Sequence, residues 1–167
     1  MIFNKILEKL SLFIFSRAFK KNIFLILFRL IKLIFFIYFN KKNKIIKIKF
    51  GKNYFNFFIK NFLEGYGTRN IYLFRENYEP LLEFGSKFFK NGDEILDLGA
   101  NNGVYSLAFS SVGKNVKVYA IEPFGFYKYN ILKSAKLNNF KNIKFINTLI
   151  SDRKKIYNLN YSRSYVT

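Results

Sequence analysis

A loop with a glycine at each end, Gly99 and Gly103, directly follows a short apolar segment and precedes a segment of helical character. Apolar and helical segments then alternate as far as residue 150, with short loops between them. The expected strands are 94–98, 116–121 and 143–150, and the expected helices are 104–112 and 126–137. Because strands that alternate with helices form parallel sheets with right-handed crossovers, the sequence predicts an α/β fold from residue 93 onward.

Two carboxylates stand at the ends of the first two expected strands. Asp97 lies two residues before Gly99, and Glu122 ends the second strand. In open α/β sheets, ligands bind at this carboxyl edge. A dinucleotide site would present G-x-G-x-x-G to a pyrophosphate, whereas this loop is G-x-x-x-G and Asp97 would repel phosphate. The pattern favours a cationic ligand with an amino-acid end, whose ribose hydroxyls could donate to Glu122 at about 1.5–3 kcal/mol per charged hydrogen bond.

Simpler roles remain open for these residues. Asp97 could cap the loop by accepting from backbone amides, and Glu122 could be a turn residue. Tyr105 and Phe124 fit packing better than stacking on a ligand, and Glu79 fits the first turn of a helix without a ligand role.

In this region the sequence resembles the FkbM family of S-adenosylmethionine-dependent methyltransferases. The resemblance covers residues 78–152, nearly half of the chain. The matching segments are Tyr78-Glu79-Pro80, residues 93–103, Tyr105-Ser106-Leu107, residues 118–123, Leu137-Asn138-Asn139 and Ile150-Ser151-Asp152. The resemblance implies a Rossmann-like class I fold that transfers a methyl group, usually to a hydroxyl oxygen. The acceptor would be a sugar, a lipid-linked glycan or a small metabolite.

The resemblance also implies a site for S-adenosylmethionine. Asp97 and the glycine loop would hold the methionine end, Glu122 the ribose, and the end of the third strand the adenine. The implied cofactor-binding residues are Asp97, Gly99, Ala100, Asn101, Gly103, Glu122, Asn147 and Thr148. Many class I enzymes carry an acid at the adenine position, and this chain has none there. No residue is identified as the catalytic base, and no metal is expected.

The resemblance further implies that the class I fold is incomplete here. A full sheet has seven strands, and the expected segments end soon after the third. The family's later acidic strand end, followed by a Val-Glu-Gly-like turn, has no counterpart. We therefore expect the strand before the glycine loop to have a bare edge. The isolated chain should fold poorly, aggregate or depend on a complementing chain that supplies further strands.

The first 40 residues are apolar with interspersed basic residues. The run 23–39 would be about 25 Å long as a helix, shorter than the ~30 Å hydrocarbon core, and it carries Arg29 and Lys32 near its middle. An interfacial helix fits better, because Arg17, Lys21, Arg29 and Lys32 fall on one side of it. The alternative is a helix packed on its own domain or on a partner subunit. A cleaved signal peptide is not expected, since no small-residue cleavage site follows.

A β-hairpin is expected from residue 45, because Ile46, Ile48 and Phe50 alternate with Lys47 and Lys49. A turn follows at 51–53, and 54–59 runs back. Residues 64–77 are expected to be irregular, with Gly65 and Gly67 as breakers, and Pro80 to start a helix that runs to about residue 89. Three segments result: an apolar basic helix (1–40), a hairpin with a helical lead-in (41–92) and an incomplete cofactor-binding half-domain (93–167). The last of these would end in a short strand and a polar tail (154–167).

Composition narrows the chemistry further. The chain contains no cysteine or histidine, which excludes disulfides, thiolate zinc sites and imidazole bases. Its net charge of +19 is compatible with nucleic acid or an anionic membrane, but codon bias explains it more simply and nucleic acid is not the expected partner. A membrane-associated non-enzymatic remnant is the first alternative to a methyltransferase, and an RNA-modifying enzyme the second. Because S-adenosylmethionine is cytosolic, the expected location is the cytoplasm or the cytoplasmic face of a membrane.

Overall fold

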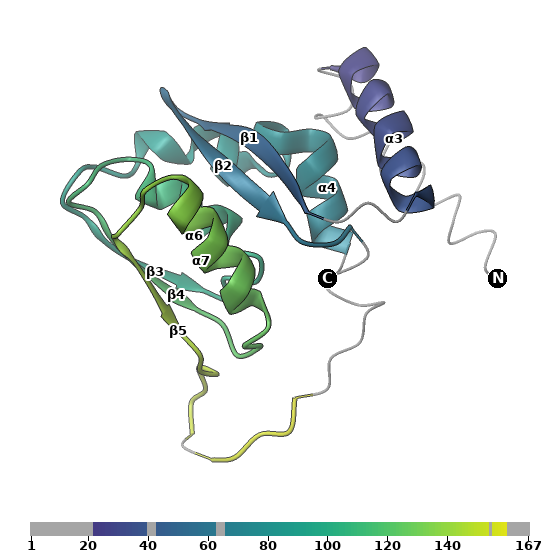
Figure 1. Ribbon diagram of the computed structural model, residues 1–167. Helices are drawn as coiled ribbons and strands as arrows, with labels where there is room; N and C mark the ends of the chain where they lie inside the picture. Colours follow the sequence, from purple (N-terminus) through teal and green to yellow (C-terminus); the bar gives the residue numbers. More distant parts are fainter. Residues whose placement is uncertain (1–21, 40–42, 63–65, 154, 160–167) are drawn as a thin grey trace.

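The computed structural model describes residues 22–39, 43–62, 66–153 and 155–159 (Figure 1). The strands are β1 (Lys44–Phe50), β2 (Asn53–Ile59), β3 (Glu94–Leu98), β4 (Lys117–Ile121) and β5 (Ile143–Ile146). The helices are α3 (Ile23–Tyr38), α4 (Tyr66–Phe74), α5 (Pro80–Phe84), α6 (Val104–Ser110) and α7 (Tyr127–Leu137), with 3-10 turns η1 (Arg75–Asn77) and η2 (Gly85–Lys87).

A three-stranded parallel sheet has the order β3-β4-β5. Leu98 pairs with Ile121, which pairs in turn with Ile146. The predicted α/β alternation is therefore confirmed. Because the strands are parallel, their carboxyl ends share one edge of the sheet, where the loop after β3 meets the residues that follow β4.

β1 and β2 form the predicted antiparallel hairpin, with Ile46 opposite Phe57 and Ile48 opposite Phe55. These four side chains are buried on one face of the hairpin, whereas Lys47 between them is exposed. Helices α6 and α7 pack against β2 on one side and against strands of the parallel sheet on the other. The result is three layers, with the helices between the hairpin and the sheet (Figure 1).

Helix α7 satisfies the outer edge of β2. The backbone N–H of Asn56 donates to Oδ1 of Asn138 (2.6 Å), and Nδ2 of Asn138 donates to the carbonyl of Asn56 (2.7 Å). Two residues further along β2, the N–H of Phe58 donates to Oγ of Ser134 (2.9 Å). These side chains take the place of a neighbouring strand, so this edge of the hairpin does not leave its polar groups unpaired.

One hydrophobic cluster joins the three predicted segments. It contains Ile26 and Leu33 of α3, hairpin residues such as Phe55, and Leu107 of α6. Val118 of β4 belongs to the same cluster, so the sheet, the hairpin and the N-terminal helix share one core.

The main departure from the sequence prediction is in residues 66–77, expected to be irregular but folded into α4 and η1. Ile71 and Leu73 are buried in the core, and this burial outweighs the weak helix propensity of Gly67. Three other elements are shorter than expected, because α5 ends at Phe84, α6 ends at Ser110 and β5 ends at Ile146. The expected helix start at Pro80 is confirmed. Residues 155–159 form no regular strand, and the rest of the predicted tail lies outside the described residues.

Strand β3 pairs only with β4 among the described residues. Its Leu96 and Leu98 are 64% and 59% exposed, an unusual degree for apolar strand residues. The missing partner on one side of β3 matches the expected bare edge, whereas the exposed leucines show that one face of this strand is uncovered as well. The complementing chain stays a prediction. In the described part of the chain, we find no helix with both the length and the apolar character needed to cross a bilayer.

Candidate functional site

The glycine loop after β3 has an unusual backbone. Gly99, Asn101 and Gly103 all have positive φ angles, of 76°, 49° and 81°. The N–H groups of Gly99 and Ala100 both donate to the carbonyl of Ile121 at the end of β4 (2.9 and 3.0 Å). The loop is thus tied to the neighbouring strand, and its left-handed residues let it turn sharply into α6.

The two glycines of the loop serve different purposes. A Cβ on Gly103 would lie 2.4 Å from Cγ1 of Ile131, so this glycine permits close packing of the loop on α7. A Cβ on Gly99 would meet no atom within 4 Å. No close contact within the chain therefore requires a glycine at position 99. The space in front of the end of β3 is open there, and a ligand could lie in it.

Glu122 is buried directly after β4, with 4% of its surface exposed. Its Oε2 accepts from the N–H of Asn101 (2.8 Å), and its Oε1 accepts from the N–H of Phe124 (2.8 Å). Glu122 therefore has the turn role that the sequence left open, and it also fixes the glycine loop. Since each carboxylate oxygen has a second lone pair, the side chain can still accept from hydroxyl donors of a ligand.

Asp97 is held by the first turn of α6. The hydroxyl of Ser106 donates to its Oδ2 (2.5 Å). Burial raises the pKa of Asp97, the Ser106 hydrogen bonds oppose this rise, and the negative charge of Glu122 adds to it. Two carboxylates thus lie close enough to repel each other, which is a favourable setting for a cation.

Asn147 and Thr148 lie past the end of β5, outside this group. Nδ2 of Asn147 donates to the carbonyls of Glu122 (2.9 Å) and Pro123 (2.7 Å), so the side chain ties β5 to the loop after β4. Thr148 lines an open cavity of about 410 Å³ together with residues of the 149–159 segment. The structure therefore brings Asp97, the glycine loop and Glu122 together, with Asn147 touching them only through the backbone.

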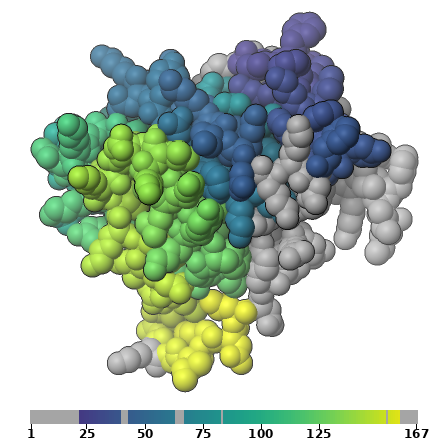
Figure 2. Space-filling view, viewed as in Figure 1, coloured from purple at the N-terminus to yellow at the C-terminus, as the bar shows by residue number. Residues whose placement is uncertain are grey.

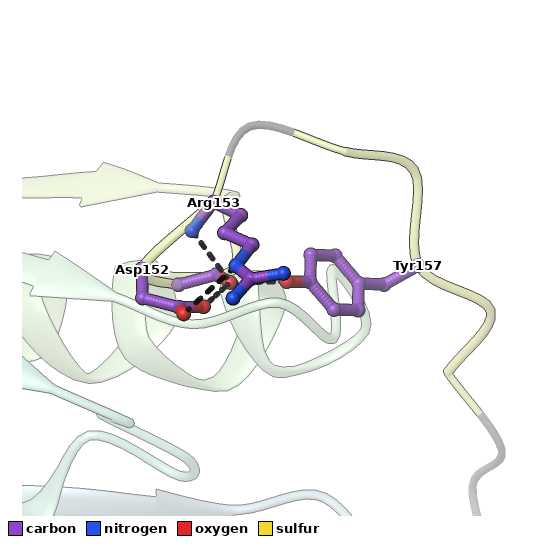
Figure 3. A network of polar contacts seen from close by, with 4 residues as sticks. Asp152, Arg153 and Tyr157 are labelled. Carbon is purple, nitrogen blue, oxygen red and sulfur yellow. Dashed lines mark hydrogen bonds and ion pairs between the residues drawn. The ribbon is translucent and has the colours of Figure 1, made fainter.

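The segment beyond Thr148 has a polar network of its own (Figure 3). Oγ of Ser151 donates to Asp152 (3.1 Å) and accepts from the N–H of Arg153 (3.3 Å), and it also contacts the hydroxyl of Tyr157. Arg153 pairs with Asp152 at 3.5 Å, and both side chains are 80% exposed. An exposed pair of this kind contributes little stability, and the network holds a loop rather than a buried site.

Sequence reasoning missed the role of Ser106. It stands nine residues after Asp97, in the first turn of α6. Because α6 begins next to the carboxyl end of β3, the Ser106 side chain lies beside Asp97. It also missed that the hydroxyl of Tyr105 donates to Glu79, which links the start of α5 to α6. Burial, with the Glu79 carboxylate beside it, raises the pKa of Tyr105, so its hydroxyl stays protonated at neutral pH and donates to Glu79.

Among the described residues, no group of three or more acids could hold a metal ion. A cavity of about 590 Å³ lies at the amino ends of β4 and β5. It is lined by the end of α6 and the loops after α6 and α7, through Ser110, Ser111, Gly113, Lys114 and residues 138–142. It is therefore at the opposite edge of the sheet from the glycine loop, and its lining includes neither Asp97 nor Glu122.

No protein-family model matches this chain, and no curated protein matches its sequence. Among solved structures, the chain is similar to Methanocaldococcus jannaschii Trm5, whose crystal structure is in complex with adenosine. The two share 19% sequence identity with a TM-score of 0.39, and the match covers 67% of this chain and 31% of that chain. This chain thus spans less than a third of the length of that structure, and a similarity of this degree assigns neither a family nor an activity.

Proposed function

We propose that this chain binds S-adenosylmethionine at the carboxyl ends of β3 and β4 and serves methyl transfer. One observation carries the proposal: two carboxylates, Asp97 and Glu122, lie on either side of a glycine loop, and Gly99 of this loop faces open space. The ligand that fits must be cationic and must offer hydroxyl donors. S-adenosylmethionine meets both conditions through its sulfonium, its ammonium and its ribose.

Each residue has a distinct task in this proposal. Asp97, oriented by Ser106, attracts the ammonium of the methionine end, and Gly99 leaves room for it. Glu122 accepts from the ribose hydroxyls with the lone pairs that Asn101 and Phe124 do not use. Asn147 shapes the adenine side by holding β5 against the loop after β4.

When bound, S-adenosylmethionine supplies a methyl group that its sulfonium already activates. The protein then needs mainly to position the acceptor in line with that methyl and to keep water away. We propose a hydroxyl oxygen of a sugar, lipid-linked glycan or small metabolite as the acceptor, in line with the resemblance to FkbM methyltransferases. Because the cofactor is cytosolic, the proposed location is the cytoplasm.

Gly99 offers a sharp test, because Gly92 is a matched control. Both have positive φ (76° and 106°), and a Cβ on either would meet no atom within 4 Å, but Gly92 lies before β3, at the opposite end of the strand. Alanine at either position therefore carries a backbone penalty without a steric clash, and the penalty at Gly92 is at least as large. Calorimetric titration with S-adenosylhomocysteine should show at least about tenfold weaker binding for Gly99→Ala and nearly unchanged binding for Gly92→Ala. Equal affinities of the two variants would count against the proposed site.

A further inference from the structure

Helix α3 packs on the rest of the chain through one narrow side. Ile26 and Leu33 are buried in the core, and Phe36 stacks on Phe62 at a centroid distance of 6.0 Å. Arg29 lies on this side too, where its Nη1 donates to the carbonyl of Leu73 in α4 (2.7 Å). The basic residue near the middle of the helix is therefore turned toward the protein.

The opposite side of α3 is apolar and exposed. At 100° per residue, seven side chains share an arc of about 120°, and no other residue of the helix falls within it. This outer face of α3 consists of Phe24, Leu27, Phe28, Ile31, Ile34, Phe35 and Tyr38. All seven are exposed, Phe24 to 86% and Ile31 to 67%. A soluble helix normally turns polar residues outward, so this face is the reverse of the usual arrangement.

The chain around this helix is strongly basic. Between Glu8 and Glu64 there is no acidic residue, whereas the same 55 residues contain thirteen lysines and arginines. Lys32 borders the outer face, with its Nζ 4.2 Å from the ring centroid of Phe28. Figure 2 shows α3 at the surface of the molecule, next to the hairpin that carries several of these lysines.

We propose that the outer face of α3 inserts into the interface of an anionic lipid bilayer. An apolar face satisfies the acyl region, and the surrounding basic residues meet the negative headgroups. The helix lies in the membrane plane, because its 16 residues span about 24 Å, less than the ~30 Å hydrocarbon core. Half-buried Arg29, which faces α4, takes no part in the insertion.

The positive charge of the protein makes an anionic lipid surface a better partner for the outer face of α3 than a second copy of the chain. Two copies docked through it would bring together two identical acid-free regions of a protein with a net charge of +19. Like charges at such an interface oppose association, whereas an anionic membrane relieves them.

The chain contains no tryptophan, so a single introduced one reports on its own position. Phe24→Trp places the reporter on the outer face, and Phe88→Trp places it at a residue that is 72% exposed outside α3. Vesicles of phosphatidylcholine with about one third phosphatidylserine should shift Phe24→Trp emission to the blue and leave Phe88→Trp emission unchanged. The absence of a shift for Phe24→Trp, or an equal shift for both, would overturn the proposal.

Affinity gives an independent measurement. The double variant Ile31→Glu/Ile34→Glu changes two exposed side chains, so the core stays intact, and its binding in vesicle flotation should fall at least about tenfold. Lys32→Gln should bind anionic vesicles about fivefold more weakly. Thermal melting of both variants checks that they fold as the unmodified chain does. An unmodified chain that forms dimers through Ile31 and Ile34 and ignores vesicles would show that the face serves self-association instead.

Discussion

The backbone N–H of Asn101 donates a 2.8 Å hydrogen bond to Oε2 of buried Glu122. Asn101 belongs to the loop after β3, and Glu122 follows β4. One carboxylate therefore fixes the glycine loop across two strands and still has lone pairs that can receive a ligand. This double use ties the geometry of the proposed site to the integrity of the loop.

Asp97→Asn should separate stability from binding. The pKa of Asp97 is raised in the folded chain, so the ionised carboxylate lowers the free energy of unfolding. That free energy should therefore increase as the pH falls through the raised pKa and the carboxylate is protonated. Asparagine removes the partly buried charge, and its Oδ1 can still accept from the Ser106 hydroxyl. We expect the variant to have a higher melting temperature at neutral pH and about tenfold weaker S-adenosylhomocysteine binding.

The pH dependence supplies the control for Asp97. Melting temperatures of the unmodified chain and of Asp97→Asn should converge as the pH falls through the raised pKa of Asp97, because both side chains are then neutral. Binding by the unmodified chain should weaken over the same range. A melting-temperature difference that does not depend on pH would contradict this assignment.

Gly103→Ala should destabilise the fold by about 2–4 kcal/mol. Alanine would place its Cβ 2.4 Å from Cγ1 of Ile131, which costs about 1–3 kcal/mol for overpacking, and the positive φ adds about 1 kcal/mol. Gly92→Ala carries only the backbone penalty, so it should lose about 1–2 kcal/mol. Urea denaturation of both variants measures the difference, and equal losses would mean that the contact with α7 is not tight.

Asn138→Ala should destabilise the chain by about 2–3 kcal/mol, since it leaves the N–H and carbonyl of Asn56 without their partners. Ser134→Ala should cost about 1–2 kcal/mol, because the buried N–H of Phe58 loses its acceptor. Lys133→Ala, at an exposed position of the same helix, should change stability by less than about 0.5 kcal/mol. If Asn138→Ala behaved like Lys133→Ala in denaturant titrations, α7 would not be what satisfies the edge of β2.

The sequence predicted the elements whose local pattern and packing agree. In the hairpin, apolar and basic residues alternate strictly from Ile46 to Phe50, and the parallel sheet shows strand–helix alternation with short loops. Helix α4 was missed because its glycine suggested a loop, whereas the burial of Ile71 and Leu73 stabilises it through contacts distant in sequence.

The orientation of α3 could not be read from its sequence alone. The pattern placed Arg29 and Lys32 on one shared basic side, but in the structure Arg29 bonds to Leu73 whereas Lys32 is exposed. A helix that is apolar nearly all round can pack through any of its sides, and the partner surface decides which one. Arg17 and Lys21 lie outside the described residues.

The location of the candidate site followed from topology, because parallel strands bring Asp97, Gly99 and Glu122 to one edge of the sheet. The hydrogen bonds within the candidate site could not be predicted from topology. Ser106 reaches Asp97 only through the placement of α6, and Asn147 bonds to backbone carbonyls after β4 that a linear pattern does not reveal. Their roles toward a ligand stay predictions.

Calorimetric titration of S-adenosylhomocysteine into the unmodified chain and into Glu122→Gln tests the central claim most directly. Glu94→Gln is the control, since Glu94 begins β3, at the opposite edge of the sheet from Glu122, and forms an exposed ion pair with Lys117. We predict saturable binding to the unmodified chain and to Glu94→Gln, and at least about tenfold weaker binding to Glu122→Gln. A chain that melts cooperatively but binds no S-adenosylhomocysteine, or binds it equally well without the Glu122 carboxylate, would contradict the proposed site.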